Sequence, residues 1–329
     1  MDDFLLMFAA DWLGKPVWAW LLFLGLVGGL LAFDLGILHK DDSEMSVSES
    51  LKLSAFYIGF GLLFGVGIWV AMGADRGMEY FTGFFIEKSL SIDNVFVISL
   101  IFSYFAIPPR YQYRALLWGI VGVIVLRGLM IGIGAALVQN FAWVMYVFGA
   151  FLIATGVKML FGHEAEPDMA KNPIVRAAKR LFRVTPELHG ERFFVRARDP
   201  KTGRFLTFAT PLFLALIVIN VADIVFAVDS VPAIFAITRD TFVVYTANIM
   251  AILGLRALYF ALAAMVARFQ YLKYALALVL VFIGTKIFAA DMLGLTKIPP
   301  WFSLLVTAGL IGGGVLYSIR RTRLDLARN

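Results

Sequence analysis

The chain contains no cysteine, so disulfide bonds and thiolate metal ligands are both excluded. Histidine is scarce, and its three copies all fall in predicted loops: His39, His163 and His189. The sequence also lacks His-Glu-x-x-His, Gly-x-Ser-x-Gly and Walker phosphate-loop signatures. No enzyme class is therefore favoured, and no cofactor is expected. Without a nucleotide site, any uphill transport would have to use an ion gradient.

Apolar residues are abundant. They make up 61% of the chain, and the mean hydropathy is +0.84, which is far above the range of soluble domains. Apolar stretches of about 20 residues, enough to cross a bilayer, recur along nearly the whole chain. We therefore predict an all-α membrane protein with about nine transmembrane helices. The predicted spans are 17–38, 51–72, 80–105, 115–138, 141–161, 207–234, 241–266, 271–290 and 299–319.

The net charge of +6 is confined to a few connecting segments. The 162–206 segment holds ten Lys or Arg residues, and we expect part of it to form an amphipathic helix on the membrane surface. The C-terminal Arg320-Arg321-Thr-Arg323 is also basic, whereas the N-terminus is acidic and lacks the basic start of a signal peptide. An odd number of spans with the N-terminus outside places every basic segment in the cytoplasm. This distribution predicts lipid contact and no nucleic-acid partner.

Two acidic phrases interrupt the apolar sequence. They are Glu87-Lys-Ser-Leu-Ser-Ile-Asp93-Asn94-Val95 and Asp223-Ile-Val-Phe-Ala-Val-Asp229-Ser230-Val231. Each contains two acids at the same spacing, followed by a small polar residue and a valine. A carboxylate near the bilayer centre costs roughly 2.5–3.5 kcal/mol, so four cost on the order of 10 kcal/mol. Such costly side chains indicate a functional polar site inside the membrane.

The repeat continues beyond these phrases. Val125-Leu126-Arg127-Gly128-Leu129 is matched by Gly254-Leu255-Arg256-Ala257-Leu258, and Thr155-Gly156-Val157-Lys158 by Ile283-Gly284-Thr285-Lys286. Each copy thus has an acid span, an arginine span and a lysine span. Because three spans are an odd number, the second copy must be inverted in the membrane, as in many secondary transporters. The predicted regions are 1–79 (two N-terminal helices), 80–161 (first repeat), 162–206 (basic loop), 207–290 (second repeat) and 291–329 (last helix and tail).

The side chains of the two phrases form an oxygen-rich set, which suits Mg²⁺, Ca²⁺ or Mn²⁺ better than copper or zinc. The candidate metal ligands are Glu87, Asp93, Asn94, Asn220, Asp223, Asp229 and Ser230. Asn220 lies one helical turn before Asp223 and could instead make an interhelical hydrogen bond. Because residues six apart do not share a helix face, the two acids of a phrase either look toward different neighbours or flank an opening in the helix. Pro232 favours an opening in the second copy.

Five further charged side chains have two possible roles each. Arg127 and Arg256 could balance the carboxylates between substrate ions or form permanent structural salt bridges. Lys158 and Lys286 could also balance charge, although their places near span ends favour snorkelling to the interface. Asp34 could be a cytoplasmic gate or a helix-end aspartate that reaches water.

These residues resemble the TerC/Alx family of bacterial membrane proteins. The likeness rests on the two acidic phrases, with Pro232-Ala233-Ile234-Phe235-Ala236 after the second, and on Phe148-Gly149-Ala150-Phe151-Leu152, Gly156-Val157-Lys158, Phe193-Phe194-Val195-Arg196 and Ala251-Ile252-Leu253-Gly254-Leu255-Arg256-Ala257. It is greatest to the Alx branch. It implies a bacterial inner-membrane protein that exports manganese from the cytoplasm, with Glu87, Asp93, Asp223 and Asp229 as the ion-handling acids. The family often has glutamate where this chain has Asn220.

The sequence therefore predicts a secondary transporter that exports a divalent cation, with Mn²⁺ implied by the resemblance and protons as the expected counter-ion. One alternative is a membrane partner that supplies metal to exported proteins or contributes to tellurite resistance. A remote alternative is an intramembrane hydrolase in which Asp93 and Asp229 form an aspartyl pair. Transport by purified protein separates the first two hypotheses, and peptide cleavage would be needed for the third.

Overall fold

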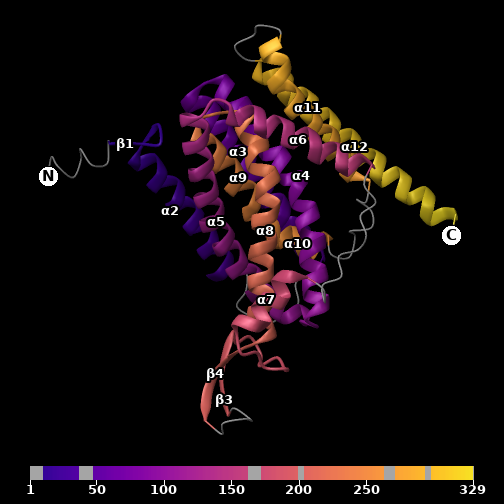
Figure 1. The fold of residues 1–329 in the computed structure, drawn as a ribbon. Coiled ribbons are helices and arrows are strands. Elements are labelled where there is room, and N and C mark those ends of the chain that lie inside the picture. The colour runs from indigo at the N-terminus through magenta and orange to yellow at the C-terminus, as the bar shows by residue number, and fades with distance from the viewer. Residues whose placement is uncertain are drawn as a thin grey trace.

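The computed structural model describes residues 10–36, 47–161, 172–198, 204–262, 271–292 and 298–328. They form a bundle of long helices with two short β-hairpins outside it (Figure 1). The elements are β1 (Asp11–Trp12), β2 (Lys15–Pro16), α2 (Val17–Gly36), α3 (Val47–Met72), α4 (Ala74–Tyr104), α5 (Pro109–Asn140), α6 (Val144–Phe161), α7 (Pro173–Leu181), β3 (Phe194–Arg198), β4 (Phe205–Ala209), α8 (Pro211–Phe235), α9 (Thr241–Leu253), α10 (Leu255–Leu262), α11 (Leu272–Met292) and α12 (Pro300–Arg328).

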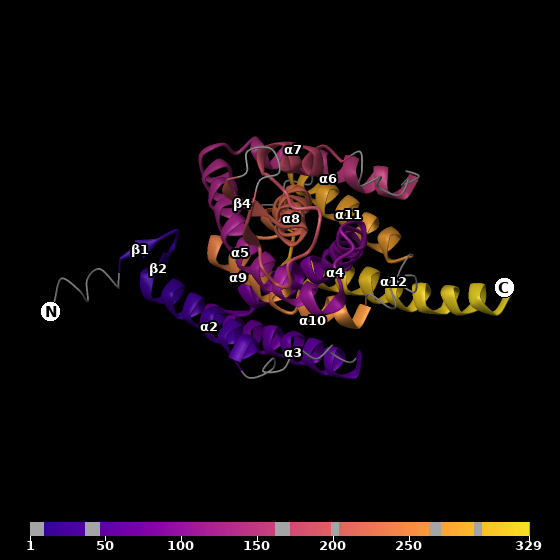
Figure 2. The same ribbon diagram turned by 90° about the horizontal axis from the view of Figure 1, so that it is seen from below.

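The prediction of an all-α membrane protein is confirmed. Within the described residues, eight helical segments are long and apolar enough to cross a bilayer, with α9 and α10 counted as one segment. They account for eight of the nine predicted spans. The ninth is α4, a 31-residue helix that carries Glu79, Glu87, Lys88 and Asp93 along its length. It packs against helices on several sides, α3, α8, α9 and α12 among them (Figure 2), and its Glu79 and Glu87 side chains are buried.

Glycines allow α3 and α4 to pack closely as a helical hairpin. The Phe84 ring lies over Gly61, and the Tyr80 ring lies over Gly65. The Tyr80 hydroxyl also donates a 2.9 Å hydrogen bond to the carbonyl oxygen of Gly61. Aromatic side chains therefore fill the space that glycine leaves, and van der Waals contact takes the place of the hydrophobic effect between helices in lipid.

Helices α6 and α11 make the closest approach between backbones. A Cβ atom at Gly156 would lie 2.6 Å from the carbonyl oxygen of Ala277, and one at Gly149 would lie 3.2 Å from that of Gly284. Small residues at membrane helix interfaces permit this kind of contact. The two glycines of α6 thus fix how closely α11 lies against α6, while α12 packs on both α11 and α4 (Figures 1 and 2).

The predicted opening of the helix at Pro232 is wrong, because α8 is continuous from Pro211 to Phe235. Pro232 lies in the last turn, where little helix remains to be bent. The interruption occurs instead at Gly254, between α9 and α10. There the Lys88 ammonium donates a 2.9 Å hydrogen bond to the carbonyl oxygen of Ala251. A polar side chain from α4 thereby satisfies backbone that the helix break would otherwise leave unbonded in the membrane.

The basic segment is only partly helical. Helix α7 buries Val175 and Ala178 and ends with Lys179 and Arg180, as expected of an amphipathic surface helix. Strands β3 and β4 form an antiparallel hairpin that the sequence analysis did not predict, so the next helix begins at Pro211 and not near 207. This hairpin projects from one end of the bundle, opposite the end that carries β1 and β2 (Figure 1).

Replacement of Gly156 by leucine should destabilise the protein, because the new side chain collides with the α11 backbone. We expect a loss of about 1–3 kcal/mol, the usual range for overpacking. Thermal unfolding of purified protein in detergent measures it. Gly132→Leu is the matched control, since a Cβ atom there meets nothing within 4 Å. Equal melting temperatures for the two variants would contradict close α6–α11 packing.

Candidate ion-binding site

Arg127 lies at the centre of a fully buried polar cluster. Its Nη1 is 2.5 Å from Glu87 Oε1, and its Nε and Nη2 each donate a 2.9 Å hydrogen bond to one oxygen of Asp223. The exposed fractions of Arg127, Glu87 and Asp223 are 1%, 0% and 5%. One guanidinium group on α5 thus connects the first acid of the α4 phrase to the first acid of the α8 phrase.

Two neutral side chains complete the hydrogen bonding of this cluster. Ser230 Oγ and Asn248 Oδ1 both accept from Arg127 Nη1, at 2.9 and 3.2 Å. Asn248 Nδ2 donates to Glu87 Oε2 at 3.0 Å, so both oxygens of that carboxylate are bonded. We call Glu87, Arg127, Asp223, Ser230 and Asn248 the Arg127 network. Sequence reasoning missed Asn248, whose equivalent in the first repeat is Gly119, and its only signal was a lone amide in an apolar span.

The Arg127 network carries two carboxylates and one guanidinium, so with all three ionised its formal charge is −1. Charges away from water are strongly disfavoured unless they are paired and hydrogen-bonded, which here requires all five side chains. A further positive charge, either a metal ion or a proton, would neutralise the network. Carboxylate, hydroxyl and amide oxygens are also the ligands that hard divalent cations prefer.

The second acids of the two phrases do not bond to Arg127. Asp229 is half-buried and accepts a 3.3 Å hydrogen bond from Thr155 Oγ1 on α6, with Lys158 acting on it electrostatically. Asp93 is also half-buried, on α4. The acids of the α8 phrase therefore look toward different neighbouring helices, which is the other arrangement that their spacing allowed.

Of the two candidate amide ligands, Asn94 is buried and Asn220 is half-buried, and neither bonds to a member of the Arg127 network. Asn220 Nδ2 donates to the carbonyl of Leu216 in its own helix, and its Oδ1 lies against the Cα of Gly122 without a hydrogen-bond donor. Asn94 is 4% exposed, and its Oδ1 also has no hydrogen-bond partner. The interhelical hydrogen bond considered for Asn220 is therefore not present among the described residues.

Arg256 has a different environment from Arg127, although the two are equivalent in the repeat. Its Nη2 bonds to Asp34 Oδ1 at the end of α2, and its guanidinium carbon lies 4.1 Å from the ring centroid of Tyr113. The side chain is 1% exposed, yet its Nε and Nη1 have no hydrogen-bond partner. Asp34 is 2% exposed, so the interpretation of a helix-end aspartate that reaches water is wrong for this conformation.

The lysines of the repeat also differ. Lys158 is exposed on α6, which agrees with snorkelling. Lys286 is only 7% exposed and donates a 2.8 Å hydrogen bond to Ser303 on α12, so the snorkelling interpretation is wrong for Lys286. Lys286 lies away from the lipid because α12 packs along α11 and covers this side chain.

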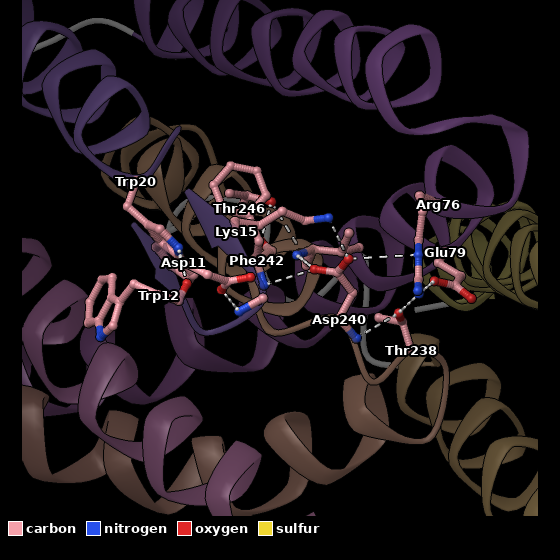
Figure 3. A network of polar contacts seen from close by, with 12 residues as sticks. Asp11, Trp12, Lys15, Trp20, Arg76, Glu79, Thr238, Asp240, Phe242 and Thr246 are labelled. Atoms are coloured by element: carbon pink, nitrogen blue, oxygen red, sulfur yellow. Dashed lines mark hydrogen bonds and ion pairs between the residues drawn. The ribbon is translucent and has the colours of Figure 1, made fainter. Parts of the chain in front are cut away.

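A second charged network lies at the β1–β2 end of the bundle (Figure 3). Asp240 caps the first turn of α9 and pairs with Lys15 at 3.2 Å and with Arg76 at 3.7 Å. Arg76 also bonds to Glu79 at 2.8 Å and to Thr238 at 3.0 Å. A cavity of about 500 Å³ opens beside it. Because each carboxylate there is met by a cation, this network fastens β2, α4 and α9 together.

Within the part of the chain that the structure describes, no three or more acidic or histidine side chains form a ready metal cluster. The Arg127 network contributes only two carboxylates, and the guanidinium bonds to both of them. Residues 72–325 match the family described as integral membrane protein TerC family. The chain belongs to the TerC family.

Curated relatives extend over nearly the whole chain. An uncharacterized membrane protein of Rickettsia bellii is 46% identical over 306 residues, covering 93% of this chain and 98% of the relative. One from Myxococcus xanthus is 44% identical, with 92% of each chain covered. An Escherichia coli relative named putative membrane-bound redox modulator Alx is 40% identical, with 95% and 99% covered. No solved structure matches this TerC-family chain.

Removal of the Arg127 guanidinium should destabilise the protein strongly. Arg127→Met leaves Glu87 and Asp223 buried without their partner, which typically costs about 3–5 kcal/mol. Thermal unfolding in detergent would show the loss. The triple variant Arg127→Met/Glu87→Gln/Asp223→Asn removes the buried charge and should recover most of the stability. A triple variant as unstable as Arg127→Met would mean that Arg127 acts through packing and not through charge.

Proposed function

We propose that this protein is a secondary transporter that moves a divalent cation out of the cytoplasm in exchange for protons. The observation that supports this proposal most directly is that one buried guanidinium, that of Arg127, pairs with an acid from each acidic helix, Glu87 of α4 and Asp223 of α8. Ionisable groups at this depth are costly and usually mark ion pathways in membrane proteins. A net charge of −1 between oxygen ligands favours a cationic substrate.

Arg127 and a divalent cation would compete for the same carboxylate oxygens. The side-chain hydrogen bonds of Arg127 all end on side chains that would coordinate the ion, so both cannot occupy the site together. Arg127 keeps the acids compensated when no ion is bound, and it must withdraw when one arrives. A proton on Glu87 or Asp223 would also weaken its hold, which provides a physical basis for proton exchange.

The predicted inverted repeat is supported by pairs of equivalent contacts. Gly156 and Gly284 are equivalent, and Gly149 and Ala277 lie about two turns before them. Gly149 packs on Gly284, while Gly156 packs on Ala277, so exchange of the two copies turns one contact into the other. A twofold axis in the membrane plane would produce this relationship, and transporters of this type bind substrate between the copies.

Two other helix pairs correspond as whole helices, with the contacting positions offset by one residue. Gly83, one turn before Glu87, faces Ala247 on α9, and Ile219, one turn before Asp223, faces Gly119 on α5. Helix α4 thus packs on α9 in the way that α8 packs on α5. The substrate site proposed here lies where these pairs meet, at Arg127.

The proposed orientation has the N-terminus outside and the C-terminus in the cytoplasm of the bacterial inner membrane. Basic side chains at the α7 end of the bundle support it: Arg114 pairs with Glu191 at 3.2 Å, and Lys179 lies over the Tyr104 ring. Cytoplasmic segments are enriched in Lys and Arg. Asp11 lies in the hairpin at the opposite end.

Manganese and the export direction rest on the resemblance to the Alx branch. The relatives named Alx are called putative redox modulators. Because this chain has no cysteine, it cannot exchange disulfides itself. We propose that any redox effect arises through the transported metal. The alternative, handing metal to exported proteins without net transport, predicts binding without flux.

Mn²⁺ flux into proteoliposomes, with and without a pH gradient, is the deciding measurement. We expect gradient-driven flux for the wild type and at least a tenfold loss for Glu87→Gln, on the order expected when a charged ligand is removed. Glu79→Gln is the matched control, since Glu79 is an equally buried acid of α4 outside the Arg127 network. No flux of Mn²⁺, Mg²⁺ or Ca²⁺ by folded wild type would reject transport.

Asp93→Asn and Asp229→Asn test whether the half-buried second acids belong to the ion path. We expect each to abolish flux with little loss of stability, because neither belongs to the buried Arg127 network. Flux and melting temperature are measured on the same preparations. An active variant would remove its acid from the proposed path, and activity in both would leave the Arg127 network as the whole site.

A further inference from the structure

The two repeats place equivalent residues in different surroundings. Arg127 and Ser230 are bonded to each other, at 2.9 Å. Their equivalents in the opposite copies are Arg256 and Asn94, since Asn94 follows Asp93 as Ser230 follows Asp229. Exchange of the two copies would therefore turn the Arg127–Ser230 contact into a contact between Arg256 and Asn94.

Arg256 and Asn94 both have unused hydrogen-bonding capacity. Arg256 Nε and Nη1 are donors without a partner, and Asn94 Oδ1 is an acceptor without a partner, although both side chains are more than nine-tenths buried. Buried polar atoms are rarely left unbonded, so each requires an explanation. The repeat supplies an explanation. Arg256 and Asn94 are equivalent to the bonded pair Arg127 and Ser230, yet the Arg256 donors and the Asn94 acceptor both lack partners.

The helices that carry these side chains are already neighbours. Val95 and Leu255, which adjoin Asn94 and Arg256 in sequence, belong to the same buried hydrophobic cluster. What keeps Arg256 in its present place is its bond to Asp34 on α2, a helix outside both repeats. The break at Gly254 separates α10 from α9, so α10 can turn without moving the whole span.

We propose that Asn94 is the acceptor for Arg256 in a second conformation, in which the second repeat adopts the arrangement that the first repeat has here. Arg256 then leaves Asp34 and approaches the acids from the opposite copy, while Arg127 withdraws. This inference rests on the inverted repeat of the proposed transporter. Asn94 and Arg256 are then positioning residues, which act when access to the site changes from one side of the membrane to the other. Asp34 is the group that holds the present conformation.

Disulfide formation can report the position of the break at the start of α10, because the chain has no cysteine of its own. A Cβ atom at Gly254 would lie 2.9 Å from Tyr57 Cβ, so the pair Tyr57→Cys/Gly254→Cys is within reach of a disulfide in this conformation. The control pair is Gly83→Cys/Ala247→Cys, with 3.4 Å between Cβ atoms on α4 and α9. It lies on the other side of the Gly254 break. Oxidant-driven cross-linking in membranes is followed by gel mobility and needs no transport activity.

The test moves one carboxylate without changing the total charge. In the Asp34→Asn/Asn94→Asp background, Arg256 loses its present partner and gains one at position 94. Cross-linking of the 57/254 pair should fall on the order of tenfold, as expected for a charged hydrogen bond made in one state only. The 83/247 pair should cross-link as in wild type. The mirror background Asp34→Asn/Ser230→Asp places the acid beside Arg127 and should retain more 57/254 cross-linking than the first background.

Each outcome decides the proposal. A fall that is clearly larger in the Asp34→Asn/Asn94→Asp background than in Asp34→Asn alone or in the Ser230→Asp background supports it. An equal fall in both backgrounds and in Asp34→Asn alone would assign the change to loss of the Asp34 bond and overturn the role of Asn94. Unchanged cross-linking in folded protein would overturn it too. If Ser230→Asp prevents folding, as shown by size-exclusion chromatography, the comparison with Asp34→Asn alone still decides. If the protein shows no flux but its cross-linking responds to the substitutions, the transport function is rejected and the Arg256–Asn94 contact is retained.

Discussion

The rest of the structure depends on one guanidinium group held away from water by two carboxylates. Arg127 joins α5 to α4 through Glu87 and to α8 through Asp223. Bilayer lipid offers no alternative partner for any of these charges, so the three helices cannot separate without large electrostatic cost. Asn248 extends the same constraint to α9. The centre of this bundle is therefore held by directional polar bonds, while its periphery is held by van der Waals contact.

The helix packing around this centre serves the same arrangement. Glycines in α6 and α11 let the two lysine helices approach until backbone touches side chain, and glycines in α3 admit the aromatic rings of α4. Only small residues allow such approach, and in lipid this is how helices gain contact energy. Helix α2 is different, because it is connected to α9 and α10 by charge: Lys15, just before it, pairs with Asp240, and Asp34, near its end, pairs with Arg256. It therefore holds both halves of the interrupted span.

Much of this could be predicted from the sequence. Long apolar stretches determined the helices, and the cost of buried charge pointed to Glu87, Asp223 and Arg127 before any geometry was known. Other features could not be predicted, because they depend on tertiary partners. The equivalent of Asn248 in the first repeat is Gly119, which has no polar side chain, so the duplication gave no signal for it. The helix break was expected at Pro232 but occurs at Gly254, where Lys88 satisfies the freed carbonyl of Ala251. The β3–β4 hairpin lies in a basic segment for which the sequence predicted an amphipathic helix in part and no strands.

The sequence separation of the charged pairs bears on how the chain enters the membrane. Glu87 and Arg127 are 40 residues apart, so they can meet soon after their helices are synthesised. Asp223 then arrives at an arginine that is already placed. Asp34 and Arg256 are separated by 222 residues, so Asp34 must wait through the synthesis of the first repeat, the basic segment and the first span of the second repeat before its partner exists. The α2 helix is thus the first membrane segment to emerge among the described residues, yet its buried charge is paired only when the arginine span of the second repeat has been made.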